Sequence, residues 1–182
     1  MITSSDRKTK TKTKTTLSGT ASEPSDLNQM MNPRNDAATG FKYPTNGRLR
    51  IRGSVAKEEL SNPTSLDAEG EPCIVVLKDG TTTDLTIGRC AGLESFLCGD
   101  DGVRSIEVAV YNYDRTTRPF SAKGDSGALI FDGKGRTVAL LHSGKAKAGS
   151  TVTHVTYGTP MWRVQEWIDQ VYPNADYAHE KW

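Results

Sequence analysis

This chain of 182 residues has only three cysteines, no long apolar run and no pair of cysteines at the spacing of a metal site. These absences argue against a disulfide-rich protein, a membrane-spanning protein and a zinc protein. Cys73, Cys90 and Cys98 are odd in number and irregular in spacing, so they indicate no disulfide framework, and no C-x-x-C pair suggests zinc. No apolar stretch is long enough to span a bilayer, and the first residues lack the hydrophobic core of a secretion signal. We therefore expect an intracellular, cytoplasmic protein with no metal, no cofactor and no membrane partner.

The net charge is only +1, and it is unevenly spread. Residues 1–20 contain five basic residues against Asp6 alone, whereas the remaining residues carry a net charge of −3. Residues 1–40 are rich in Thr, Ser, Lys, Asn and Asp, and bury too little apolar surface to offset their conformational entropy. We predict a disordered arm over residues 1–40. Its lysines favour a solvated tail over a nucleic-acid contact or a nuclear-localisation signal.

The rest of the chain divides into three parts. Residues 41–72 are transitional, with one short strand expected at Leu49–Gly53, where apolar and basic residues alternate. Residues 73–171 form the folded domain, and residues 172–182 a tail. Short apolar runs separated by turn residues are typical of a barrel or a sandwich. The predicted strands are Cys73–Leu77, Thr82–Gly88, Val103–Tyr113, Ala128–Phe131, Thr137–Leu141 and Thr151–Tyr157.

After Pro160 the spacing of the apolar residues changes from that of a strand to that of a helix. Apolar residues then recur at steps of three and four, which predicts one face of a helix that ends before Pro173. These residues are Met161, Val164, Trp167, Ile168 and Val171. The expected fold is therefore all-β, with an antiparallel barrel followed by a C-terminal helix.

The segment Gly124-Asp-Ser-Gly127 has the composition of a serine nucleophile turn. A serine hydroxyl needs a sharp turn that presents its Oγ, and donors for a developing oxyanion. Glycines on either side of Ser126 allow such a turn, and the N–H groups of Gly124 and Ser126 can then form an oxyanion hole. The same four residues also suit an ordinary turn, so the motif depends on its context.

The context resembles the second barrel of the chymotrypsin/trypsin-like serine proteases. Val76–Gly88 resembles the K-x-G-x-T-T-G-x-T-x-G strand pair that opens this barrel in bacterial and fungal members. The region from Leu49 to Tyr177 is also similar to fungal intracellular trypsin-like proteins, through four segments. These segments are L-x-I-R-G, G-E-P-C, F-S-x-x-G-D-S-G and V-T-Y-x-T-P. The resemblance implies a six-stranded antiparallel barrel, the second half of a double barrel.

The resemblance also implies a role for seven residues. Ser126 matches the nucleophile, Gly124 the oxyanion-hole amide, and Asp125 the aspartate that supports that loop. Phe120 matches the base of a substrate side-chain pocket, which would then be apolar. His142, Ser143 and Gly144 match the strand that walls this pocket and pairs with the substrate backbone.

Two departures from the family pattern bear on activity. The family order places the base histidine before the serine, but the histidines here, His142, His154 and His179, all follow Ser126. Asp84 stands where the opening motif usually has glycine. The resemblance places His142 close to the buried acid of the family triad, so a Ser126–His142 dyad would supply a base, provided that the imidazole reaches the hydroxyl.

We therefore expect a serine-protease homologue that retains the nucleophile and oxyanion loop but is not hydrolytically competent alone. The alternatives are an active serine endopeptidase of which this chain is a fragment or half-site, with a partner barrel supplying His and Asp, and a peptide-binding module. A peptide or protein is the expected ligand. The barrel face that a first barrel would cover is expected to cause dimerisation or poor solubility, or to be covered by residues 41–70.

Overall fold

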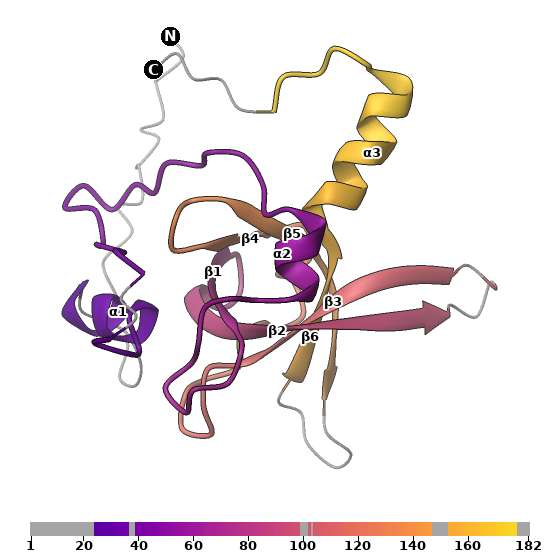
Figure 1. Ribbon diagram of the computed structural model, residues 1–182. Coiled ribbons are helices and arrows are strands. Elements are labelled where there is room, and N and C mark those ends of the chain that lie inside the picture. The colour runs from indigo at the N-terminus through magenta and orange to yellow at the C-terminus, as the bar shows by residue number, and fades with distance from the viewer. Residues whose placement is uncertain (1–23, 37–38, 99–101, 103, 147–152, 178–182) are drawn as a thin grey trace, which may run out of the picture.

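The computed structural model describes residues 24–36, 39–98, 102, 104–146 and 153–177. Six strands close into one antiparallel barrel in the order β1-β2-β3-β6-β5-β4, and a helix follows the last strand (Figure 1). The elements are α1 (Pro24–Met31), α2 (Lys57–Ser61), β1 (Ile74–Gly80), β2 (Asp84–Cys98), β3 (Arg104–Asn112), β4 (Leu129–Asp132), β5 (Thr137–Ala146), β6 (Thr153–Pro160) and α3 (Met161–Val171). The predicted six-stranded barrel with a C-terminal helix is confirmed.

Several strands extend beyond their predicted ends, β5 to Ala146 and β6 to Pro160 among them. β1 continues through Lys78 to Gly80, where the sequence suggested a hairpin turn, and the turn lies at Thr81–Thr83 instead. β2 runs on to Cys98, with an irregular register between Cys90 and Glu94. Such a bulge lets a strand bend around a barrel. The helices of the described residues include none long and apolar enough to cross a membrane.

The two faces of the strands form two separate cores, because successive side chains of a strand point to opposite faces. One core fills the barrel, and includes Ile74 and Val76 of β1, Val108 and Val110 of β3, and Phe120. Val55 and Leu60, from α2 and the segment before it, join this core. The other core lies on the outside of β1, β2 and β4, and its strand residues are Val75, Leu77, Ile87 and Phe131.

The outer core corrects the predicted boundary of the disordered arm. Leu27 and Met31 of α1 and the ring of Phe41 are buried against the outer strand residues, with Tyr43 and Leu49 packed beside them. Residues 24–36 and 39–40 therefore belong to the folded domain. The apolar spacing from Leu27 to Met31 is one helical turn, and a single turn is too short a signal to stand out from a polar segment. The lysine-rich tract of the predicted arm lies outside the described residues.

The short strand expected at Leu49–Gly53 is not a regular strand. The segment is extended and is held by single backbone bonds: Arg52 N–H donates to Gly135 O at 2.8 Å, and Thr137 N–H donates to Gly53 O at 2.8 Å. β5 already pairs with β4 and β6 in the closed barrel, so this segment forms only one parallel bridge, at Ser54 and Thr137. The expectation that residues 41–70 cover the face left open by a first barrel stays a prediction.

The buried contacts of α1 predict that this helix contributes to the stability of the barrel. Leu27→Ala should lower the free energy of unfolding by about 2 to 4 kcal/mol, because it removes a buried side chain and leaves a cavity. Gln29→Ala, at an exposed position of the same helix, should change it by less than about 0.5 kcal/mol. Urea denaturation of both variants measures this. Equal, small effects would show that α1 does not pack on the barrel in solution.

Candidate functional site

The Gly124-Asp-Ser-Gly127 segment forms a tight loop between β3 and β4. Gly124 and Gly127 have φ values of +106° and +88°, in the left-handed region that favours glycine. The N–H groups of Asp125, Gly127 and Ala128 donate to the carbonyls of Ala122, Leu141 and Asp125 at 2.8–3.1 Å. Within the described part of the chain, the N–H groups of Gly124 and Ser126 have no hydrogen-bond acceptor. The loop therefore leaves two backbone donors free on either side of Asp125, as an oxyanion hole requires.

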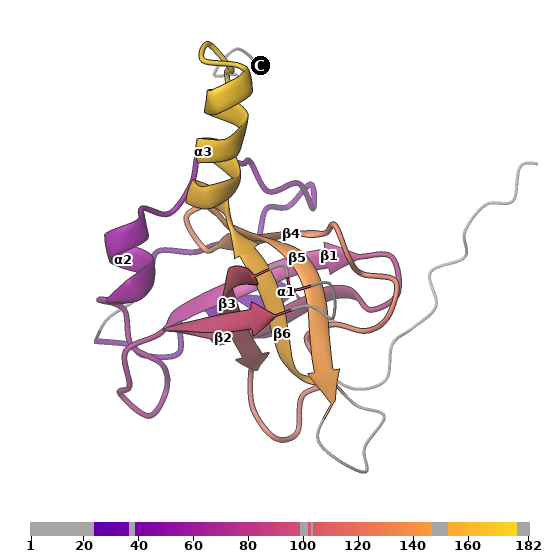
Figure 2. The same cartoon turned by 90° about the vertical axis from the view of Figure 1, so that its right-hand side faces the viewer.

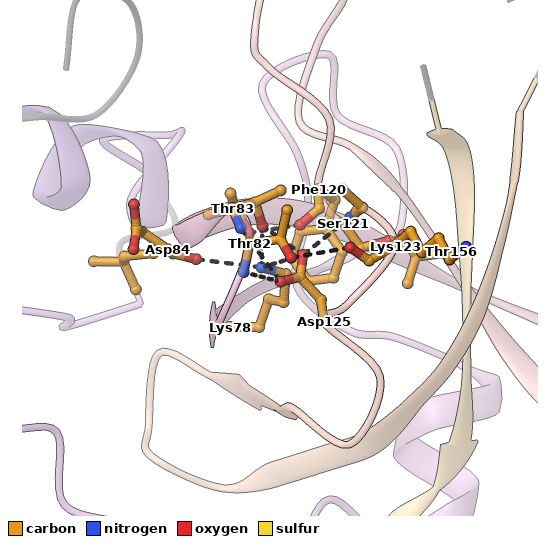
Figure 3. Close-up of polar contacts among 12 residues, drawn as sticks. Lys78, Thr82, Thr83, Asp84, Phe120, Ser121, Lys123, Asp125 and Thr156 are labelled. Atoms are coloured by element: carbon orange, nitrogen blue, oxygen red, sulfur yellow. Dashed lines mark hydrogen bonds and ion pairs between the residues drawn. The ribbon is translucent and has the colours of Figure 1, made fainter. Parts of the chain in front are cut away.

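Asp125 holds this loop to the β1–β2 turn (Figure 3). Its carboxylate is buried and accepts hydrogen bonds from the N–H of Thr82 at 2.8 Å, the hydroxyl of Thr83 at 2.7 Å and the N–H of Ala122 at 2.9 Å. Thr82 also donates its hydroxyl to the carbonyl of Lys123 at 2.9 Å. The bonds from Thr82 and Thr83 cross more than 40 positions of the chain, so they fix the loop relative to the barrel.

Lys78 supplies the counter-ion of Asp125. Its side chain is 0 % exposed, its Nζ lies 3.4 Å from Asp125 Oδ2, and the ammonium also donates to the hydroxyl of Thr83 and to the carbonyl of Asp84. A buried charge is tolerated when it is paired and hydrogen-bonded. This explains why a lysine continues an otherwise apolar strand.

Burial affects the pKa values of the two groups in different ways. Desolvation lowers the pKa of Lys78, although the charge of Asp125 opposes this effect. Desolvation alone would raise the pKa of Asp125, but the hydrogen bonds from Ala122, Thr83 and Thr82 and the charge of Lys78 outweigh it and lower this pKa to about 2. Asp125 is therefore ionised at neutral pH and acts as an acceptor.

The β1–β2 strand pair leaves space for the carboxylate of Asp125 at Gly80. A Cβ at Gly80 would lie 2.5 Å from Asp125 Oδ1, so a larger residue would displace the aspartate. Asp84 has a φ of +53°, the one non-glycine residue with positive φ among those described. Glycine adopts this backbone conformation most readily, and aspartate is among the residues that tolerate it.

Phe120 lies inside the barrel and is 0 % exposed. A Cβ at Gly88 would lie 2.7 Å from its ring, and the hydroxyl of Thr86 donates to its carbonyl at 2.7 Å. The hydroxyls of Ser121 and Thr156 are also buried and lie 2.6 Å apart. The role of Phe120 at the base of a substrate pocket stays a prediction; in this conformation its ring faces the core rather than solvent.

Ser126 is exposed, and its hydroxyl donates to the carbonyl oxygen of His142 at 3.1 Å. The structure thus brings Ser126 and His142 together, but through the main chain of the histidine. A carbonyl oxygen cannot accept the proton that a serine nucleophile must lose. Among the described residues, no histidine ring is hydrogen-bonded to Ser126. The Ser126–His142 dyad stays a prediction.

Ser143 and Gly144 follow on β5 and pair with Tyr157 and Thr156 of β6. On the opposite side, the pairing of β4 with β5 ends at Leu140, and the residues before β4 reach only to Leu141. Within the described residues, the β4-facing edge of β5 is therefore unpaired beyond His142. The segments that flank Ser126 expose Lys123, His142 and Lys145 and no acidic side chain.

Sequence reasoning missed the roles of Lys78, Thr82 and Thr83. All three lie in the motif that carried the resemblance, but the sequence pattern places Lys78 in a turn, and Thr82 and Thr83 in the strand that follows. The available signal was Lys78 itself, a charged residue directly after four apolar residues and six positions before Asp84. Its partner is 47 positions away and could not be identified without the fold.

Comparison with solved structures finds similarity to serine proteases. One is a chymotrypsin from Cellulomonas bogoriensis, at 20 % identity and a TM-score of 0.44 over 71 % of this chain and 56 % of the other. Another is a glutamic acid-specific serine protease that utilizes a histidine triad in substrate binding, at 20 % identity and a TM-score of 0.44 over 74 % of this chain and 62 % of the other. The chain thus matches less than two thirds of each protease. No protein-family model and no curated protein matches the chain.

The lowered pKa of Asp125 predicts an acid-sensitive contribution to stability. A carboxylate whose pKa falls on folding stabilises the native state above its unfolded pKa of 3.8, and this contribution disappears as the pH falls towards 2. The difference in free energy of unfolding between the native chain and a Lys78→Met/Asp125→Asn double variant should shift against the native chain by about 2 kcal/mol between pH 5 and pH 2. Urea denaturation at several pH values measures the difference.

The control for this measurement is Asp79→Asn, because Asp79 is an exposed carboxylate on the same strand. Its stability difference from the native chain should change less over the same pH range than that of the double variant. A difference between native chain and double variant that is constant with pH would show that Asp125 has an ordinary pKa and is not held by the contacts described.

Proposed function

We propose that this chain is a trypsin-like serine-protease homologue that presents a serine nucleophile loop and does not hydrolyse peptides by itself. The observation that supports this most directly is the hydrogen bond from Ser126 Oγ to the carbonyl of His142. The loop has the features that a nucleophile turn needs: an exposed serine, two free backbone donors and a buried supporting aspartate. What it lacks among the described residues is a base.

The missing base decides the expected rate. In a full triad the histidine takes the proton of the serine hydroxyl, and loss of a triad member leaves only about 10³–10⁴-fold acceleration over water. The oxyanion donors can contribute that residual acceleration without a base. A loop of this kind would bind a carbonyl group and polarise it, but would turn over slowly.

A half-site that a partner completes is the first alternative. Here Ser126 would be exposed so that a separate barrel could bring a histidine and an aspartate to its hydroxyl. The exposure of Ser126 and the preformed loop are compatible with this reading, since the loop is held by Asp125 without any partner.

A peptide-binding module is the second alternative, and one observation favours it. The unpaired edge of β5 beyond His142 offers backbone groups to an extended peptide, which would add to the sheet as a strand. The exposed Lys123, His142 and Lys145 around this edge favour a peptide with acidic side chains.

Labelling with a fluorophosphonate probe distinguishes these readings. Without a base the Ser126 hydroxyl stays protonated at neutral pH, so the chain should label no faster than a Ser126→Ala variant. A Ser126–His142 dyad would label at Ser126, lose the label in His142→Ala, and slow as the pH drops below about 6.5. A half-site would label only after a barrel with its own histidine and aspartate is added, and a peptide-binding module would not label in either case.

The matched control is Ser61→Ala, which removes an exposed hydroxyl at the end of α2 and should leave any labelling unchanged. Rapid labelling of the isolated chain that depends on Ser126 and survives His142→Ala would contradict the proposal, because a base other than His142 must then be present.

A further inference from the structure

One edge of β5 is open beside the loop that carries Ser126. On the side of β4, the last backbone bonds are from Leu141 N–H to Ala128 O at 2.9 Å and from Gly127 N–H to Leu141 O at 2.8 Å. Among the described strands, the rest of β5 pairs with β6 alone, and Figure 2 shows the two running side by side past the end of β4. We call this side of residues 142–146 the open edge, because an extended peptide can pair with its backbone groups.

The direction of the neighbouring strands decides which end of a peptide reaches this loop. β5 is antiparallel to both β4 and β6. A peptide that is antiparallel to β5 runs in the direction of β4, from the Ala146 end of the open edge towards His142. Its C-terminal end then lies at the Ser126 loop, because the residues before β4 already occupy the edge at Leu141. The open edge therefore accommodates the end of a chain better than an internal stretch.

The groups at this end of the open edge suit a carboxylate. The N–H groups of Gly124 and Ser126 have no acceptor among the described residues, and Ser126 also carries a hydroxyl, 3.1 Å from the carbonyl oxygen of His142. Free backbone N–H groups of a turn bind anions. A terminal carboxylate offers two charged oxygens, whereas an amide offers one neutral oxygen, and hydrogen bonds to charged acceptors are the stronger. The loop therefore favours a free C-terminus.

The charges around the loop favour the same end of a peptide. Lys123, His142 and Lys145 are exposed, and the open edge has no acidic residue. Asp125 is the only acidic residue of the loop, and its charge is buried and paired with that of Lys78. This surface thus attracts a carboxylate, and it repels the ammonium that a peptide parallel to β5 would bring there.

We propose that this site is a receptor for the free C-terminus of an extended peptide. The last residues of the ligand pair with the open edge of β5, and its terminal carboxylate accepts hydrogen bonds from the N–H groups of Gly124 and Ser126. The inference rests on the proposed function, because a site with a working base would cleave peptides rather than retain them. The ligand is recognised by its carboxylate and its extended backbone, so a chain end is bound and an internal segment is not.

A pooled library of random heptapeptides tests the proposal. Half of the peptides carry a free C-terminal carboxylate and half a C-terminal amide, and those retained by the immobilised full chain are identified by mass spectrometry. Peptides with the carboxylate should be enriched roughly tenfold, because hydrogen bonds to charged groups contribute more than those to neutral groups. Methylation of the backbone nitrogens of a retained peptide should abolish its binding, because a strand added to a sheet edge needs these donors.

Lys123→Glu should lower the affinity for a retained carboxylate peptide at least roughly tenfold, because it reverses the charge beside the carboxylate. The matched control is Lys134→Glu, which makes the same charge change at an exposed lysine between β4 and β5 and should leave binding unchanged. Circular dichroism checks that both variants stay folded.

Three results would overturn the inference and leave the proposed function standing: equal retention of carboxylate and amide peptides, retention of neither, or equal affinities of Lys123→Glu and Lys134→Glu. Shortened peptides in the library would have a different meaning. They would show that the chain hydrolyses peptides by itself, which would contradict the proposed function and the inference with it.

Discussion

The carboxylate of Asp125 is the contact on which the arrangement of the candidate site depends. It joins two stretches of sequence more than 40 positions apart. The N–H of Thr82 and the hydroxyl of Thr83, in the β1–β2 turn, donate hydrogen bonds to it, and so does the N–H of Ala122 in its own loop. Lys78 neutralises the buried charge from the adjacent strand. Gly80 leaves the space that the carboxylate occupies, and the positive φ of Asp84 turns the chain so that the carbonyl of Asp84 meets the lysine.

The contacts of Asp125 fix the shape of the loop, but they supply no base for the hydroxyl of Ser126. A buried ion pair is weak evidence for stability as such, because the cost of desolvating both charges offsets their attraction. Its clear effect here is positional: with Asp125 fixed, Ser126 is exposed and the N–H groups of Gly124 and Ser126 remain without intramolecular acceptors. The proton of the serine, however, is donated to a carbonyl oxygen. The described site therefore has an exposed serine beside two backbone donors without acceptors, and under the proposed function a base is what it would have to obtain.

The barrel could be predicted from the sequence because its strands are short apolar runs separated by turn residues, and the closing helix because its apolar residues keep one period. The loop at Ser126 could be located because glycine is needed on either side. The burial of Lys78 could not be predicted, since local pattern assigns a lysine before Asp-Gly to a turn, and only the fold places Asp125 beside it. Helix α1 was missed for a similar reason: Leu27 and Met31 are two apolar residues in a polar segment, and their partners, Val75, Leu77, Ile87 and Phe131, lie on strands far along the chain.

Amide hydrogen exchange at the Asp125 contacts tests the central claim most directly. If the buried pair holds the loop, the amides of Thr82 and Ala122 should be protected in the native chain about as well as those of the barrel strands. Lys78→Met should reduce their protection at least roughly tenfold relative to Val108 and Val110 of β3, because the carboxylate loses its counter-ion. Asp79→Asn, the exposed neighbour, should leave these amides unchanged. Protection that is the same in the native chain and in Lys78→Met would contradict the account, since the loop would then be held without the buried ion pair.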